Sequence, residues 1–324
     1  MLSITQYREA FLEYLETAVT LKEPVNLYEP ISYILHLGGK RLRPVLVLMS
    51  AEVFESSFKK ALSASLAIEV FHNFSLVHDD IMDDAPLRRG KATVHERWDV
   101  NTGILSGDAM LIYSYQLLEN YDGPIFKELL QLFNSTAMRV CEGQQYDVDF
   151  ATQDDVEIKD YLKMIEYKTA VLVAAALQMG AIIAETTPQN KQAMYEFGRL
   201  LGIAFQLQDD YLDAFGDPET FGKQVGGDII ENKKTFLYLT ALQMADAVEA
   251  RQLEHLYSIN PGEATAKIEA VKQIFENSGA SLRAREEIKK YTNKAFEALE
   301  ELDIPEDRKA LLRDFGQDLM NREV

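Results

Sequence analysis

Two clusters of aspartates share one spacing, at residues 79–83 (DDIMD) and at residues 209–213 (DDYLD). Each cluster follows an apolar run with helical periodicity, where an unpaired charge is expensive. Residues four positions apart face the same side of a helix, so the first and last aspartates of each cluster project together. Such carboxylates repel one another unless a cation lies between them, and these oxygen ligands suit Mg²⁺ bound with a substrate phosphate. The pattern predicts a Mg²⁺–diphosphate site between two facing helices.

Two basic runs indicate what this site recognises. Residues 38–44 (GGKRLRP) carry three cations after a glycine turn, and residues 88–91 (RRGK) carry three more directly after the first acidic cluster. The chain as a whole has 52 acidic and 33 basic residues, so cations gathered in this way indicate recognition of anions by forked donors. We therefore expect two phosphate-bearing ligands, one bridged by metal and one held by lysine and arginine alone.

Composition excludes several other classes of protein. The net charge of −19 argues against a nucleic-acid partner, which needs a basic surface. The single cysteine, Cys141, excludes an intrachain disulfide framework and fits a reducing, cytoplasmic compartment. Charged residues interrupt the apolar N-terminus, so we expect an amphipathic helix there and no signal peptide. The longest uncharged stretch, residues 169–184, is shorter than the ~20 residues that cross a bilayer. We expect a buried core helix there and no transmembrane segment.

Helices must position these clusters, because helical periodicity runs through most of the chain. Glycine and proline are few, at 17 and 9 in 324 residues, and Thr187-Pro188 is typical of a helix start. No stretch convincingly alternates polar and apolar residues between hairpin turns, which favours a helical class. Neither a linker nor a repeat beyond the acidic clusters divides the sequence. We predict an all-α protein with a single domain over residues 1–324.

Together the motifs resemble the trans-isoprenyl diphosphate synthases, the polyprenyl synthetase family. The resemblance runs from the basic run near residue 40 to the lysines near residue 233, in the family's order. It implies that three Mg²⁺ ions are bound by Asp79, Asp80, Asp83, Asp209, Asp210 and Asp213. The diphosphate of isopentenyl diphosphate would contact Lys40, Arg43, His72 and Arg89. The allylic diphosphate would contact Arg88, Lys168, Thr169, Gln206, Lys223 and Lys233. Residues 143–147 (GQQYD), which include Gln144 and Asp147, also match family positions.

The family implies a large helical bundle of the isoprenoid synthase type around a central apolar cavity, typically in a homodimer. The implied reaction is a head-to-tail (1'-4) condensation of isopentenyl diphosphate with an allylic diphosphate, by ionisation, condensation and elimination. Mg²⁺ and fixed cations would neutralise the departing diphosphate, and a dry pocket would protect the allylic cation from water. The resemblance assigns catalytic roles to Asp79, Asp83, Arg88, Lys168, Asp209 and Lys223.

Product length is the finer expectation. In the family, bulky residues four, five and eight positions before the first aspartate set the floor of the pocket. Here these positions hold Ser75, Phe74 and Phe71. The small Ser75 opens the first turn and the two phenylalanines close the pocket soon after. We expect geranylgeranyl diphosphate as main product, with farnesyl diphosphate as the alternative. The other interpretation is that both phenylalanines are ordinary core residues.

Three other functions compete with this one. A class I terpene cyclase also uses an aspartate cluster, but it has no second diphosphate that would explain Lys40, Arg43 and Arg89. A non-catalytic partner subunit of a heteromeric synthase usually loses aspartates, and both clusters are intact here. A di-iron bundle would use Glu69-x-x-His72 but needs a second such pair, which the sequence lacks. The C-terminus carries a single basic residue, Arg322, so a basic tail that closes over the site is not expected.

Overall fold

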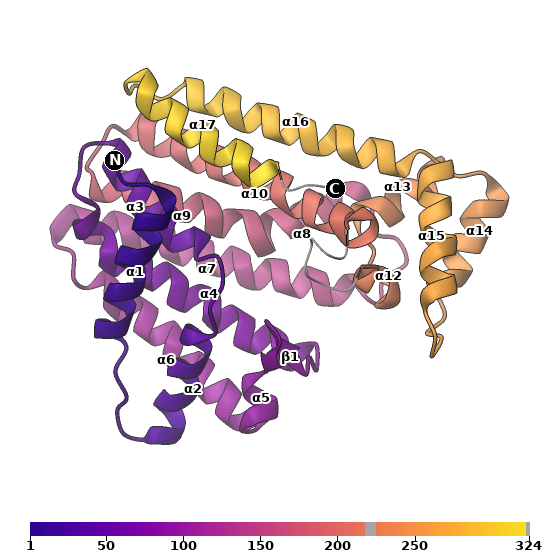
Figure 1. Cartoon of the computed structure of the whole chain (residues 1–324), viewed down its shortest axis with the longest axis horizontal. Coiled ribbons are helices and arrows are strands. Elements are labelled where there is room, and N and C mark those ends of the chain that lie inside the picture. Colours follow the sequence, from indigo (N-terminus) through magenta and orange to yellow (C-terminus); the bar gives the residue numbers. More distant parts are fainter. Residues whose placement is uncertain (218–224, 322–324) are drawn as a thin grey trace. The chain divides into compact units, whose positions relative to one another are not determined.

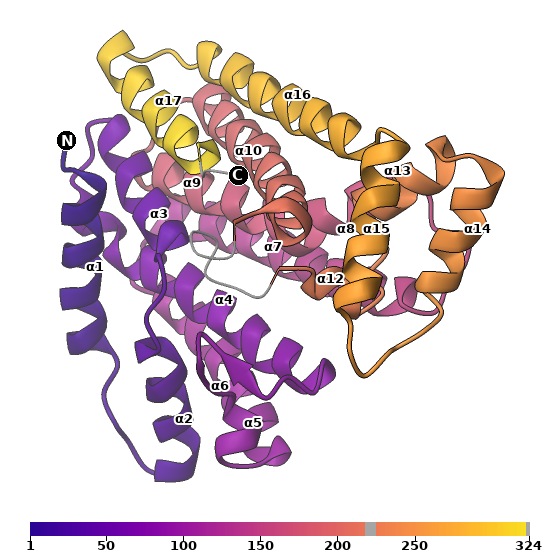
Figure 2. The same cartoon turned by 45° about the vertical axis from the view of Figure 1, so that its right-hand side comes forward.

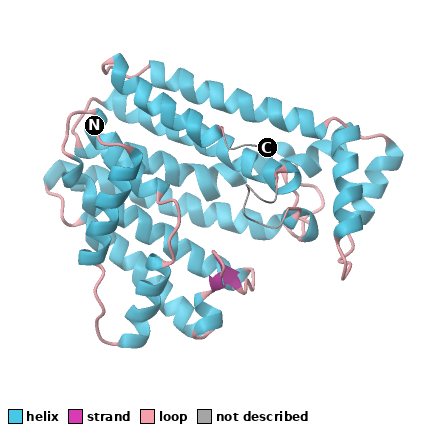
Figure 3. Ribbon diagram, viewed as in Figure 1, coloured by secondary structure: helices cyan, strands magenta, loops and turns pink. Residues whose placement is uncertain are grey.

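The computed structural model describes residues 1–217 and 225–321. Helices dominate these residues, and the predicted all-α class is confirmed (Figure 3). By its internal contacts the chain divides into two compact units. Unit 1 consists of Met1–Ala137 and Leu172–Tyr195, and unit 2 consists of Met138–Val171 and Glu196–Val324. The single domain over residues 1–324 stays a prediction, and each unit is described by itself.

Unit 1 begins with an amphipathic helix, as predicted. Ser3 caps α1 in a reciprocal pair of hydrogen bonds with Gln6, and the helix buries Tyr7, Phe11 and Leu15 on one face. The elements of unit 1 are α1 (Ile4–Ala18), α2 (Val25–His36), α3 (Leu42–Val53), the 3₁₀-helix η1 (Phe58–Ala61), α4 (Leu62–Met82), β1 (Leu87–Arg88), β2 (Lys91–Ala92), α5 (Val94–Arg97), α6 (Val100–Leu118), most of α9 (Val171–Ile183) and the first parts of α7 (Gly123–Phe150) and α10 (Pro188–Phe215).

Helices α4 and α6 pack closely against each other in unit 1 (Figure 1). Two glycines of α6 permit this approach. A Cβ on Gly103 would lie 2.9 Å from Cδ1 of Ile81, and one on Gly107 would lie 2.2 Å from Nε2 of His78. Ile81 lies within the first acidic cluster and His78 directly before it, so the glycines allow α6 to support the end of α4 that carries the aspartates.

A short β-hairpin follows α4, the one pair of strands among the described residues, and the all-α class stands beside it (Figure 3). Its turn residues, Arg89 and Gly90, both have positive φ, at 54° and 74°. Positive φ at both central positions is the geometry of a two-residue type I′ turn. The strands hold only two residues each, so they leave no alternating pattern in the sequence. The hairpin presents Arg88 and Arg89 next to the end of α4.

The uncharged stretch forms the buried helix that was predicted. All-round burial is visible along α9, where Val171, Ala174, Leu177 and Met179 are fully covered. Residues Ile158–Ile183 are long and apolar enough by composition to cross a bilayer, but 67% of the window that passes this test is buried inside the protein. A core helix explains that composition. The predicted helix start at Thr187-Pro188 is confirmed, because α10 begins at Pro188.

Every secondary-structure element described in unit 2 is a helix (Figure 2). Its core packs Tyr161 and Phe236 with Leu253, Val271 and Phe275. The two long helices α16 and α17 lie side by side (Figures 1 and 2). Besides the remaining parts of α7 and α10, unit 2 contains α8 (Ile158–Ile165), the π-helix η2 (Glu166–Ala170), α12 (Gly227–Ile230), α13 (Phe236–Met244), α14 (Ala247–Leu256), α15 (Thr265–Asn277), α16 (Ala280–Glu300) and α17 (Glu306–Met320).

Candidate active site

The first acidic cluster lies at the C-terminal end of α4. Asp79 is half-buried in the last turn, and Asp83 is the exposed C-cap, whose backbone N–H donates to the carbonyl oxygen of Asp79 at 2.9 Å. A helix C-terminus is the negative end of the helix dipole, so carboxylates there are unfavourable until cations balance them. Carboxylate oxygens one turn apart at such an end fit Mg²⁺.

Asp80, the middle aspartate, is buried and bound to the hairpin. It is 1% exposed, and Nε of Arg88 donates to both of its carboxylate oxygens, at 2.9 and 2.8 Å. A terminal nitrogen of Arg88 donates a third hydrogen bond at 2.6 Å. Burial raises the pKa of the Asp80 carboxyl, and the guanidinium opposes that effect. Asp80 therefore fixes the position of Arg88 beside the other aspartates.

A cluster of cations surrounds His72 in unit 1. Nη1 of Arg43 donates to Nε2 of His72 at 3.2 Å. Burial lowers the pKa of His72 well below its usual range, and the charges of Arg43 and Arg89 lower it further. A neutral imidazole that accepts from Arg43 is consistent with both observations. Nε of Arg43 is buried with no hydrogen-bond partner among the described residues. An anion would satisfy that donor and offset the repulsion between the arginines.

The glycine turn before α3 is shaped around Arg89. Arg89 donates a hydrogen bond to the carbonyl oxygen of Gly38. Gly39 has a φ of 112°, and a Cβ there would lie 2.9 Å from Cζ of Arg89. Only glycine combines this backbone with so close an approach. Lys40 follows on the exposed side of the turn. The predicted residues Lys40, Arg43, His72 and Arg89 thus belong to one neighbourhood.

Arg41, from the same basic run, has a structural role. Its guanidinium donates to the carboxylate of Glu69 and to the carbonyl oxygen of Leu35, and the side chains of Arg41 and Glu69 are only 2% and 3% exposed. Nδ2 of Asn73 donates to the same Glu69 oxygen at 3.1 Å. Glu69 is therefore the partner of a buried arginine, and the di-iron interpretation loses its carboxylate ligand.

Aromatic rings gather beneath the first acidic cluster. Phe71 is 1% exposed and lies 5.5 Å, centroid to centroid, from Phe74 and 5.2 Å from Phe133 of α7. Phe133 also contacts Tyr115 of α6, at 5.0 Å. Ser75 is half-buried, and its hydroxyl donates to the backbone carbonyl one turn earlier. Two of the predicted chain-length residues, Phe71 and Phe74, therefore belong to an aromatic layer that α6 and α7 complete.

The second acidic cluster lies at the C-terminal end of α10, in unit 2. Its middle aspartate is again the buried one: Asp210 is 8% exposed, whereas Asp209 and Asp213 are half-buried. The hydroxyl of Tyr161 donates to one carboxylate oxygen of Asp210, and Nε2 of Gln206 donates to the other at 2.8 Å. Burial raises the pKa of Asp210 well above its usual range, and the charge of Asp228 adds to this effect. The charges of Asp210 and Asp228 therefore disfavour each other, and a cation nearby would stabilise both.

Asp213 binds the segment that carries one of the predicted lysines. The backbone N–H of Asp228, in α12, donates to a carboxylate oxygen of Asp213 at 2.9 Å. Gly227 makes room for this contact, because a Cβ there would lie 3.2 Å from the other oxygen. Lys233 follows α12 and pairs with Glu231 at 2.7 Å and with Asp228 at 3.7 Å. Lys233 therefore lies among carboxylates close to the second acidic cluster.

The π-helix η2 carries the other two predicted residues of this half. Lys168 forms an ion pair with Asp147 of α7 at 2.5 Å, and the hydroxyl of Thr169 donates to Gln206 at 3.1 Å. Gln206 thus links Thr169 to Asp210. π-helical turns are rare and often mark functional positions. Asp147 belongs to the motif at residues 143–147, and its pairing with Lys168 gives it a definite structural partner. Gln144 lies one turn before it on α7.

Two glycines allow η2 to approach its neighbours. A Cβ on Gly143 would lie 2.3 Å from the backbone nitrogen of Lys168, and one on Gly202 would lie 2.7 Å from Cα of Ala170. Neither backbone position can yield easily, so α7 and α10 need glycine at these points. The first glycine of the 143–147 motif is thus explained by packing rather than by contact with a ligand.

The structure assembles each half of the predicted site within its own unit. Lys223 lies outside the described residues. The facing of the two helices and the central cavity stay predictions. The residues that sequence reasoning missed are partners of predicted ones, namely Tyr161, Asp228 and Phe133. None shares a motif with its partner, so only the fold brings them together.

Comparison with known proteins identifies the family. The family model described as polyprenyl synthetase matches residues 24–277. The short chain isoprenyl diphosphate synthase of Methanothermobacter thermautotrophicus is 36% identical over 309 residues, which cover 95% of this chain and 94% of that protein. The geranylfarnesyl diphosphate synthase of Natronomonas pharaonis is also 36% identical, over 99% of this chain and 97% of that protein.

Solved structures agree with these sequence matches. A crystal structure of a geranylgeranyl pyrophosphate synthase is 54% identical, covers 100% of both chains and superposes with a TM-score of 0.96. A geranylgeranyl pyrophosphate synthetase from the archaeon Geoglobus acetivorans is 31% identical, over 98% of this chain and 99% of that one, with a TM-score of 0.88. The predicted isoprenoid synthase fold is confirmed, and the chain belongs to the polyprenyl synthetase family and is a prenyltransferase.

Proposed function

We propose that this prenyltransferase joins isopentenyl diphosphate head to tail (1'-4) to an allylic diphosphate and makes geranylgeranyl diphosphate as its main product. One observation supports the two-diphosphate chemistry above others. Arg43 and Arg89 gather at a neutral His72 with a buried donor left over, and the Glu69 carboxylate, whose charge acts on both arginines, is bound by Arg41. Such a pocket suits a diphosphate that is bound without metal. A terpene cyclase would have no use for it.

The remaining residues suit the allylic substrate. Asp79, Asp83, Asp209 and Asp213 would hold Mg²⁺ ions, three with substrate bound, and Mg²⁺ would neutralise the departing diphosphate. Arg88, fixed by Asp80, would contact that diphosphate as a preorganised cation. Lys168, Thr169, Lys223 and Lys233 would add further contacts, and Gln206 and Asp147 would orient Thr169 and Lys168.

The bond changes then need no covalent intermediate with the protein. The bond between the allylic C1 and the diphosphate oxygen breaks, and the double bond of isopentenyl diphosphate attacks the allylic cation. A proton leaves the condensed cation, and the released diphosphate is its acceptor. The fixed cations of the protein stabilise charge throughout, and apolar walls exclude water.

Product length would be set by the aromatic layer of Phe71, Phe74, Phe133 and Tyr115. Ser75 leaves space in the turn above these rings, and the tail would stop where Phe74 and Phe71 begin. A relative that makes geranylfarnesyl diphosphate and another named for geranylgeranyl diphosphate are of similar identity to this chain. The identities do not distinguish the two products. The bulk of the aromatic rings supports geranylgeranyl diphosphate, the shorter of the two, and farnesyl diphosphate is the second candidate.

The purified chain tests the whole proposal. It is incubated with isopentenyl diphosphate and with dimethylallyl, geranyl or farnesyl diphosphate, with and without Mg²⁺, and products are measured by mass spectrometry. We expect a C20 product from all three primers and none without Mg²⁺. Turnover by the single chain would also separate a complete synthase from a partner subunit. A cyclic hydrocarbon made from one diphosphate, or no product from the pure chain, would contradict the proposal.

We also propose that the protein is a homodimer in the cytoplasm. Helix α6 exposes Ile104, Leu105 and Ile112, which are 41%, 60% and 59% exposed and recur at seven- and eight-residue spacing. Apolar residues at that spacing share one helix face, and such a face suits burial against a second copy of the chain.

A further inference from the structure

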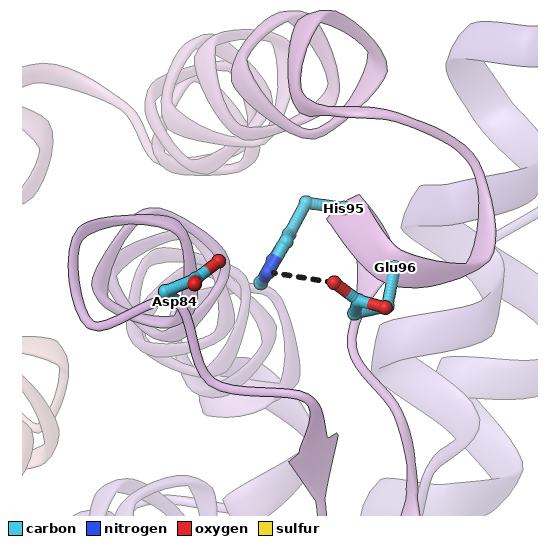
Figure 4. Close-up of side chains that lie close together, drawn as sticks. All are labelled: Asp84, His95 and Glu96. Carbon is cyan, nitrogen blue, oxygen red and sulfur yellow. Dashed lines mark ion pairs between the residues drawn. The ribbon is translucent and has the colours of Figure 1, made fainter.

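We propose that Asp84, His95 and Glu96 form a second metal site in unit 1, distinct from the aspartate clusters, that binds Zn²⁺. Each residue offers one ligand atom, and the three atoms lie within 4.8 Å of one another. Figure 4 shows the imidazole of His95 with the carboxyl groups of Asp84 and Glu96 on either side. None of the three residues has a role in the prenyl transfer reaction proposed above.

His95 is the residue that points to a ligand. It is 8% exposed, and both of its ring nitrogens are buried without a hydrogen-bond partner among the described residues. A buried polar group normally has a partner, and leaving one unsatisfied costs about 1–3 kcal/mol. A Glu96 oxygen lies 3.8 Å from Nε2, which is too long for a hydrogen bond. A metal ion would satisfy this nitrogen.

The distances are compatible with a shared ion. Two ligands of a tetrahedral Zn²⁺, each about 2.0–2.1 Å from the metal, lie roughly 3.3 Å apart. The distance of 3.8 Å between Nε2 of His95 and the Glu96 oxygen, and distances of up to 4.8 Å among the three ligand atoms, are therefore somewhat wide. Asp84 and Glu96 are both exposed, so rotation of their side chains can shorten them while His95 stays fixed.

The backbone already holds the three residues together. The hydroxyl of Thr93 donates to the carbonyl oxygen of Ala85 at 2.8 Å, and its N–H donates to that of Pro86 at 3.2 Å. These bonds join the segment after Asp84 to the residue two positions before His95. Behind His95, Gly103 of α6 comes close, since a Cβ there would lie 3.7 Å from Cβ of His95. A bound ion would join the two ends of the loop at residues 84–96, which contains the hairpin with Arg88 and Arg89.

The donor set selects the kind of metal. Mg²⁺ takes oxygen ligands almost only, whereas one imidazole nitrogen with two carboxylates suits Zn²⁺. The aspartate clusters offer oxygen alone. Excess Mg²⁺ should therefore occupy those clusters and leave the site at His95 to Zn²⁺.

Histidine NMR tests the site directly, because the chain has only five histidines. The full-length protein is labelled with ¹⁵N in its imidazoles and titrated with Zn²⁺ in excess Mg²⁺, without substrate. We expect the His95 ring signals to move within one equivalent while the other four stay in place. His95→Gln identifies the signal, and His255→Gln, which alters an exposed histidine of α14, is the matched control.

Two carboxylate variants separate metal binding from folding. Asp84→Asn and Glu96→Gln change exposed side chains, and each should weaken Zn²⁺ binding by more than about tenfold in calorimetry, in line with losses seen for lesser changes around metal sites. The proposal is overturned when His95 does not respond at one equivalent, when another histidine responds in its place, or when both carboxylate variants bind Zn²⁺ like the original protein.

Discussion

The buried pair of Arg41 and Glu69 provides the sharpest test of how the basic run is positioned. Both side chains are at most 3% exposed, so Glu69→Leu would leave the Arg41 charge buried with the backbone carbonyl of Leu35 as its acceptor. Removing one partner of such a pair costs about 3–5 kcal/mol of the free energy of unfolding. The double variant Arg41→Met with Glu69→Leu removes both charges. It should recover most of that loss, apart from about 1 kcal/mol for the freed carbonyl of Leu35.

Urea unfolding and steady-state kinetics together measure the two consequences. We expect the double variant to be nearly as stable as the original chain but to show a raised KM for isopentenyl diphosphate, because Lys40 and Arg43 flank the lost anchor. Arg251→Met, which alters an exposed arginine of α14, is the control for the loss of an arginine outside this buried pair. The reasoning is refuted when Glu69→Leu alone costs less than about 1 kcal/mol, or when the double variant is no more stable than the single one.

Four further predictions concern the product, the second cluster, pH and assembly. Phe74→Ala or Phe71→Ala should lengthen the product by one or more C5 units and Ser75→Phe should shorten it, and unchanged mass spectra in all three would contradict the aromatic floor. Tyr161→Phe removes the hydroxyl that donates to Asp210, a charged hydrogen bond worth about 1.5–3 kcal/mol, and should lower activity and Mg²⁺ affinity, whereas Tyr238→Phe should not. The folded pKa of His72 lies below its ordinary value of 6.5, so the unfolded chain binds the extra proton and stability should fall as pH drops below about 6.5. Urea titrations should show that His72→Asn weakens this dependence, and an unchanged slope would count against it. Ile112→Glu should shift the protein towards monomer in light scattering, with Val248→Glu, on exposed α14, as control.

Much of the candidate site was predictable because its signals are local. The spacing of aspartates in each cluster follows from helical periodicity, and the apolar runs before them mark the same two helices. The hairpin was missed for an equally local reason, since strands of two residues are too short to show alternation. The only sign of its turn in the sequence is the pair Arg89-Gly90. An arginine seldom adopts a positive φ, so this pair does not predict the turn.

The sequence by itself determined the all-α class, the two acidic clusters and the cations that accompany them. Only the tertiary structure decided how the members of each cluster differ. Asp80 and Asp210 are buried because Arg88 and Tyr161 reach them, and Asp79, Asp83, Asp209 and Asp213 are left more open. Three identical carboxylates in one motif have the same intrinsic chemistry. Their burial and partners depend on a hairpin turn and on a helix 49 residues away, which short-range patterns do not record.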